Sequence, residues 1–370
     1  MTTSFKVTLG CLGLALATST ALAQEDGPPP VWQGVWEGAV GDAPVHVCLE
    51  GTPVGQGAYY YDRVKRLLRL DPGKAGGEWF EQETFHEDGA RWRIVPHEGT
   101  LTGTWSDGKK ELPVRLTRIA ASSKDENGPC GSTAFNRPRV GPVRLMSGHA
   151  IKDGERYTTW SFKPGPWFGD SIEITTFTLD RPGPQVAKVN GLLRSALPKP
   201  DGTGDWFDCV AGTLDGDFAK AVEPTLITAR WLGVRDTSDY FCGGPHPESF
   251  STARTFDLSR GIEVDPLDWF GLKAVHREDQ GGQYGVYKTL TPAFRAAILK
   301  GWKGESDADC DDAMRSQEDW NVGIARGALV FSPQFPHVIA ACTVDFKVPF
   351  ARLQSWMNEQ GKAAVATLPN

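Results

Sequence analysis

Short runs of alternating apolar and polar residues fill residues 31–119, and turn-forming residues separate them. Alternation with a period of two is typical of half-buried β-strands. Glycine-rich turns such as 71–77, 86–90 and 106–110 lie between the runs. The predicted strands are 35–40, 43–50, 56–62, 65–70, 78–85, 91–95, 100–105 and 112–118. We therefore expect an all-β antiparallel meander, either an open sheet or a small closed barrel.

Residues 120–142 have no such period and are rich in glycine, proline and polar side chains. This composition is typical of a linker, which Cys130 would tether. The chain is also too long for one ordinary core. We therefore expect a first domain over residues 24–119, a linker over 120–142 and a second domain over 143–370.

The second region mixes helical and strand periods. Residues 184–197 carry apolar side chains on one helical face, residues 291–302 begin with Thr291 as N-cap, and residues 349–361 form a third amphipathic segment. The predicted strands are 225–234, 251–258, 261–266, 327–333 and 339–350. This pattern predicts an α+β domain in which helices cover one side of an antiparallel sheet.

The first 23 residues have the pattern of a secretory signal peptide. Lys6 precedes an apolar run over residues 7–17, and the segment ends in the small-x-small sequence Ala21-Leu22-Ala23. We expect cleavage after Ala23 and a periplasmic or secreted protein. No later segment offers about 18 uncharged apolar residues, so we expect no membrane span.

Six cysteines remain when Cys11 is removed with the signal peptide. An even number of cysteines in an oxidising compartment indicates disulfides. Order along the chain favours Cys48–Cys130, Cys209–Cys242 and Cys310–Cys342. The alternative, a zinc site, lacks C-x-x-C or H-x-x-x-H spacing. We expect no metal and no cofactor.

The net charge of −7 argues against a nucleic-acid partner and is compatible with a cationic protein partner. The sequence contains no G-x-S-x-G elbow, no H-E-x-x-H motif and no P-loop. Residues 307–318 place acidic side chains at calcium-loop positions, but Asp312 stands where that loop needs glycine. A helix with an acidic first turn explains the same residues.

The segment YFCGGPHPESF, residues 240–250, places His246 between two prolines and after a glycine pair. The glycines permit unusual backbone conformations, and the prolines fix φ on either side of the histidine. Three roles stay open for His246: capping of backbone groups, contact with a partner or ligand, and catalysis. The other histidines show no metal-ligand or triad-like local spacing; they are His46, His86, His97, His149, His276 and His337.

This segment and the following TARTFDLSRGIEVDPLDWF together resemble a family of extracytoplasmic domains. The shared pattern is an aromatic residue, GG-x-H, a strand ending in F-D-L, a glycine, and an aspartate–aromatic turn. The matching positions are Tyr240, Gly243, Gly244, His246, Phe256, Asp257, Gly261, Asp268 and Phe270. The resemblance covers about residues 172–358.

In that family the domain forms the extracellular part of lysozyme-sensing anti-sigma factors, where it binds lysozyme, and it also accompanies some peptidoglycan deacetylases. The resemblance implies an α+β fold and non-catalytic recognition at the cell wall. This chain departs from the pattern in having no transmembrane helix, no T-F-D-D-G metal motif, and Cys242 and Pro245 beside the central motif.

The leading hypothesis is an exported, non-catalytic binding protein of the bacterial envelope, whose partner is lysozyme, another cell-wall enzyme or a peptidoglycan fragment. The expected binding residues are Tyr240, Gly243, Gly244, His246, Asp257 and Trp269. One alternative is a glycan-acting enzyme with Asp257, Asp265 or Asp268 as acid or base beside His246. Another is a structural scaffold that uses exposed sheet edges.

Overall fold

The computed structural model describes most of the chain beyond the expected signal peptide. His86 and Asp307 lie outside the described residues, as does the signal peptide itself. The described residues are 31–50, 56–73, 76–82, 89–121, 128–165, 168, 172–212, 214, 216–282, 285–304 and 308–370.

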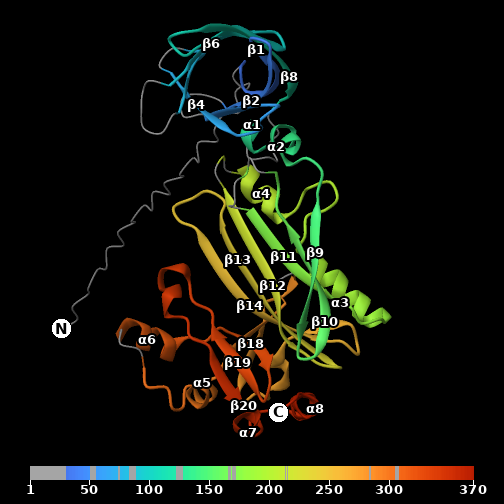
Figure 1. The fold of residues 1–370 in the computed structure, drawn as a ribbon. Helices are drawn as coiled ribbons and strands as arrows, with labels where there is room; N and C mark the ends of the chain where they lie inside the picture. Colours follow the sequence, from blue (N-terminus) through green and yellow to red (C-terminus); the bar gives the residue numbers. More distant parts are fainter. Residues whose placement is uncertain are drawn as a thin grey trace, which may run out of the picture.

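The first eight strands form a closed antiparallel barrel, which lies at one end of the molecule (Figure 1). They are β1 (Gly34–Val40), β2 (Ala43–Leu49), β3 (Gly57–Tyr61), β4 (Leu68–Pro72), β5 (Glu78–Glu81), β6 (Arg91–His97), β7 (Thr100–Ser106) and β8 (Glu111–Ala120). Each overlaps one predicted strand, and the pairing of β1 with β8 closes the sheet. At this closure a β-carbon on Gly38 would lie 1.9 Å from the Arg115 carbonyl oxygen, so only glycine fits there.

Aromatic side chains fill the barrel, and one carboxylate oxygen among them accepts several hydrogen bonds. Trp36, Trp79 and Trp92 are almost completely buried. Glu81 accepts hydrogen bonds from the Tyr59 hydroxyl at 2.6 Å and from the indole nitrogen of Trp105 at 2.5 Å. The barrel interior is therefore a packed core with an internal polar anchor.

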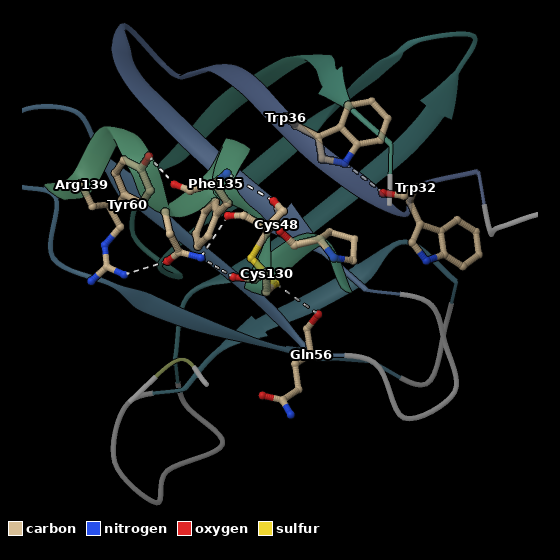
Figure 2. Close-up of a disulfide and its surroundings, with 11 residues drawn as sticks. Trp32, Trp36, Cys48, Gln56, Tyr60, Cys130, Phe135 and Arg139 are labelled. Carbon is tan, nitrogen blue, oxygen red and sulfur yellow. Dashed lines mark hydrogen bonds between the residues drawn. A yellow bond between two sulfur atoms is a disulfide. The ribbon is translucent and has the colours of Figure 1, made fainter. Parts of the chain in front are cut away.

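Two short helices, α1 (Gly128–Gly131) and α2 (Thr133–Val140), follow the barrel inside the expected linker. Figure 2 shows how they attach: the Cys48–Cys130 disulfide joins β2 to α1, and Phe135 of α2 packs beside it. The Tyr60 hydroxyl donates to the Phe135 carbonyl oxygen at 2.9 Å. Within the expected linker, residues 128–140 are therefore largely helical, and buried apolar side chains and a covalent bond hold this segment on the outside of the barrel.

A seven-stranded sheet forms the centre of the molecule, in the order β15-β14-β13-β12-β11-β10-β9. The α+β fold class is confirmed, but the sheet is not wholly antiparallel because β11 runs parallel to β12. The helices α3 (Pro184–Arg194) and α4 (Asp205–Gly212) make this crossover, and side chains of both are buried against the sheet. The strands are β9 (Leu145–Lys152), β10 (Glu155–Phe162), β11 (Ile172–Leu179), β12 (Asp217–Ile227), β13 (Trp231–Phe241), β14 (Glu248–Asp257) and β15 (Ile262–Val264).

The C-terminal third forms the largest apolar cluster, in which the strand β18 contacts β12, β13 and β14. One of its sheets pairs β16 with β17, and the other contains three strands in the order β18-β19-β20. The strands are β16 (Val275–Asp279), β17 (Val286–Leu290), β18 (Trp320–Ala325), β19 (Ala328–Pro333) and β20 (Phe346–Pro349). The helices are η2 (Pro266–Trp269), α5 (Pro292–Ile298), α6 (Ala308–Ser316), η4 (His337–Cys342), α7 (Phe350–Leu353) and α8 (Glu359–Val365).

Three predicted elements differ from those observed. Of residues 339–350, predicted as one strand, the first part belongs to the helix η4 and only Phe346–Pro349 form a strand, β20. Residues 225–234, predicted as one strand, form the end of β12, a turn and the start of β13, because the Thr228 hydroxyl accepts from the Trp231 amide and closes the turn. The helix predicted over 349–361 is interrupted: Phe350–Leu353 form α7, and Asn358 caps the separate helix α8. Across the described part of the chain, no helix is long and apolar enough to cross a membrane.

All three disulfides favoured by chain order are present: Cys48–Cys130, Cys209–Cys242 and Cys310–Cys342. They fit an exported protein, because disulfides persist in oxidising compartments.

Candidate functional site

The loop between β13 and β14, residues 242–247, is exposed along its whole length. Gly243 and Gly244 have φ angles of 88° and 107°, a region that glycine adopts without steric penalty. Cys242 is bonded to Cys209 of α4, which ties the start of the loop to the helix layer. The loop therefore combines full exposure with covalent and conformational restraint.

His246, at the tip of this loop, stacks on His337, the first residue of η4. The ring centroids lie 4.2 Å apart and the ring planes differ by 4°. Glu248 approaches the same group, with its Oε1 atom 3.5 Å from His246 Nδ1. The Pro247 carbonyl oxygen lies 3.1 Å from that nitrogen, so the loop itself supplies one backbone partner to His246.

The sequence alone did not indicate that His337 is a partner of His246, because the two lie far apart along the chain and no local spacing joins them. A signal was nevertheless present. Each histidine follows a proline, Pro245 or Pro336. Each also lies within a few residues of a disulfide cysteine, Cys242 in the loop and Cys342 at the end of η4.

Aromatic rings continue this surface along the sheet. Tyr240 stacks on Phe250 and, on its other side, on the buried Phe218, with centroid distances of 6.0 Å in both pairs. Tyr240 pairs with Glu248 across the two strands, which places Glu248 and Phe250 on the same face of the sheet. Phe250 is 52 % exposed, so the ladder of rings ends in an apolar contact surface.

Asp257, expected beside His246, lies at the opposite end of β14. It is 1 % exposed and accepts hydrogen bonds from the Ser259 hydroxyl at 2.5 Å and from Arg230 at 3.1 Å. Burial alone would raise the pKa of the carboxyl, but these hydrogen bonds outweigh it and the pKa is lowered. The expectation that Asp257 lies near the loop surface is therefore wrong, because pairing with β13 places it opposite Trp231.

Trp269 is also placed differently from the expectation. It is 1 % exposed and meets Trp231 edge to face at 5.4 Å. A β-carbon on Gly361 would lie 2.2 Å from the Trp269 carbonyl oxygen, so α8 closes over this residue. Trp269 belongs to the C-terminal core and is not available to a partner.

Two of the carboxylates named in the enzyme alternative, Asp265 and Asp268, form ion pairs with one lysine. Asp265 and Asp268 lie 2.7 Å and 2.8 Å from Lys288 Nζ. Burial would lower the pKa of Lys288, but the two carboxylates outweigh it and raise the pKa. Asp265 also lines a shallow pocket of about 360 Å³, together with Asp319, whose pKa is raised by burial. No structural contact joins these groups to His246 in the described part of the chain.

One group of described residues brings three possible metal-ligand atoms close together. His246, Glu248 and His337 each offer one ligand atom, and these atoms all lie within 4.8 Å of one another. Nitrogen and oxygen donors of this kind suit zinc, copper and nickel.

Comparison with known proteins gives no family: no family model matches the chain, and no curated protein matches it. Among solved structures, a DUF3298 family protein from Pseudomonas aeruginosa PAO1 is 14 % identical, with a TM-score of 0.35, and covers 59 % of this chain and 94 % of its own. A member of the same family from Bacteroides fragilis is 11 % identical, with a TM-score of 0.34, over 61 % of this chain and 98 % of its own.

Proposed function

We propose that the protein is an exported binding protein of the bacterial envelope, and that it recognises a cell-wall enzyme through the surface around His246. This loop surface comprises Tyr240, Gly243, Gly244, His246, Glu248, Phe250, His337 and Val338. The partner we propose to test first is lysozyme, because the sequence pattern of the loop resembles that of lysozyme-sensing domains.

The proposal rests on one observation: a restrained loop and its neighbours expose both apolar and polar side chains on one surface. Phe250 and Val338 are 52 % and 85 % exposed, and the polar groups of His246 and Glu248 accompany them. An apolar centre with a polar rim is typical of protein interfaces. Because the loop is already restrained by Cys242 and by its prolines, little conformational entropy is lost when a partner binds.

Electrostatics supports a basic partner. The chain carries a formal charge of −7, and Glu248 and the exposed Asp239 lie at the loop end of the hairpin. A negative surface attracts a cationic protein and accelerates its association, with an effect that declines as salt is added.

The enzyme alternative has less support. Asp257 is buried in an ion pair with Arg230, and Asp265 and Asp268 are both paired with Lys288. In each case the carboxylate stabilises a local turn or strand contact, and none accompanies His246.

The test is a titration of the oxidised chain, without the expected signal peptide, against several lysozymes, together with a lysozyme activity assay. We expect saturable binding that Phe250→Ser weakens by about tenfold or more, since removal of an interface anchor costs about 1–2 kcal/mol or more. Leu272→Ser is the matched control, because Leu272 is an 80 % exposed apolar residue outside the loop surface. Absence of binding up to about 0.1 mM would remove lysozyme as the partner.

A further inference from the structure

We propose that His246, Glu248 and His337 form a binding site for a divalent transition-metal ion, with zinc as the ion that the donor set fits best. This inference goes beyond the proposed function and does not depend on it. The site would join the β13–β14 loop to η4, two segments that are far apart in the sequence.

The positions of the three donors are close to those of a zinc site. Zinc–nitrogen and zinc–oxygen bonds of about 2.0–2.2 Å in a tetrahedron separate the ligand atoms by about 3.3–3.5 Å. The donors of the three residues already lie within 4.8 Å of one another. Side-chain rotations of the two exposed histidines would bring the donors together.

The stacked imidazoles bring the two histidines together, and metal binding requires the rings to reorient. His246 and His337 lie face to face at 4.2 Å with nearly parallel ring planes, so their in-plane nitrogen lone pairs lie side by side. A metal ion binds each imidazole through one nitrogen lone pair. Binding would splay the two rings from the parallel stack so that one nitrogen of each faces the ion.

The backbone on both sides of the site is restrained before any ion binds. Cys242 is bonded to Cys209 and Cys342 is bonded to Cys310, so a disulfide holds each ligand segment close to its histidine. Pro245 and Pro247 flank His246, and Pro336 precedes His337. A site whose ligands are held in advance loses less entropy on binding than one that must order two loops.

The donor set also defines what the bound ion would do. Three protein ligands leave one position of a tetrahedral zinc ion open for water or for a side chain of another molecule. Because this position faces solvent at the loop surface, the ion is accessible to a histidine or carboxylate from a second protein. The site therefore takes a transition-metal ion as its ligand, with an exchangeable fourth position.

The experiment is a titration of untagged, oxidised protein with Zn²⁺ by isothermal calorimetry, repeated with Co²⁺ and followed by visible absorption. The variants are His246→Ala, His337→Ala and Glu248→Gln. The matched control is His149→Ala, because His149 is likewise an exposed histidine with a nearby carboxylate, Asp180 at 3.7 Å. Circular dichroism of each variant verifies that it is folded.

We expect one Zn²⁺ site per chain that both histidine variants weaken by at least about tenfold and that His149→Ala leaves unchanged. Glu248→Gln should weaken it by a smaller factor, since the amide oxygen is a poorer donor than the carboxylate. Absence of Zn²⁺ binding up to about 1 mM would overturn the proposal. Equal binding by wild type and either histidine variant would also overturn it.

Discussion

The two ends of the β13–β14 hairpin contrast in almost every physical respect. At one end the loop around His246 is exposed, and its ionisable groups meet across segments from different parts of the chain. At the other end Asp257 is buried, and its partners Arg230 and Ser259 come from adjacent turns. β14 has ten residues, so about 30 Å of strand separates the two.

This difference shows that one sequence motif can serve two purposes. In the F-D-L part of the motif, the buried Asp257 carboxylate links the sheet to the adjacent turns, because a buried carboxylate needs the donors that surround it. The GG-x-H part holds no core contact and presents side chains to solvent. Substitutions at the Asp257 end should therefore change stability, and substitutions at the His246 end should change binding.

The largest expected loss of stability comes from a substitution in the core next to the Asp257 end. Trp269→Ala should lower the free energy of unfolding by about 3–5 kcal/mol, because it removes a buried indole packed against Trp231. Thermal or urea unfolding measures the change. A loss smaller than about 1 kcal/mol would contradict the assignment of Trp269 to the core.

Asp257→Asn should have a smaller but pH-dependent effect of about 1–3 kcal/mol at pH 7, from the loss of charged hydrogen bonds to Arg230 and Ser259. The pKa of Asp257 is lowered in the folded state from its ordinary value of 3.8. Its carboxylate therefore stabilises the fold fully above pH 3.8, and this contribution is lost as the pH falls further towards the folded-state pKa.

Urea unfolding of wild type and Asp257→Asn at several pH values measures this effect. The two proteins should differ most near neutral pH and converge in acid. Asp239→Asn is the matched control, since Asp239 is an exposed carboxylate at the loop end of the same hairpin. A constant difference between wild type and Asp257→Asn down to pH 2 would contradict the account.

The smallest effect on stability is expected at the loop. His246→Ala should change the free energy of unfolding by less than about 0.5 kcal/mol, because its side chain is exposed and its contacts are to other exposed groups. The same variant should weaken partner binding. A loss of stability above about 1 kcal/mol without a loss of binding would make the loop a structural turn.

The barrel strands were predictable because one face of each packs in the barrel core, and in strands such as β6 and β8 apolar and polar residues alternate. The segment 128–140 escaped prediction for the opposite reason. Its two helices are too short to show a helical period, and its burial depends on Cys130 and Phe135 meeting outward-facing side chains of the barrel such as Tyr60.

The candidate site was predictable only in part. His246 was recognisable because glycine and proline around it restrict the backbone, which is a local property. Its contact with His337 depends on how β14 and η4 pack. Asp257 and Trp269 were wrongly expected near His246, because closeness in a sequence motif does not give closeness in space. The length of β14 separates Asp257 from the loop, and burial places Trp269 in the core.

Hydrogen–deuterium exchange of the protein with and without bound lysozyme tests the central claim most directly, because it compares the two ends of the hairpin in one experiment. We predict that lysozyme slows amide exchange in residues 242–250 and 336–342 and leaves residues 255–270 unchanged. Protection confined to residues 255–270 or to the barrel, with none at the loop, would contradict the assignment of recognition to the surface around His246.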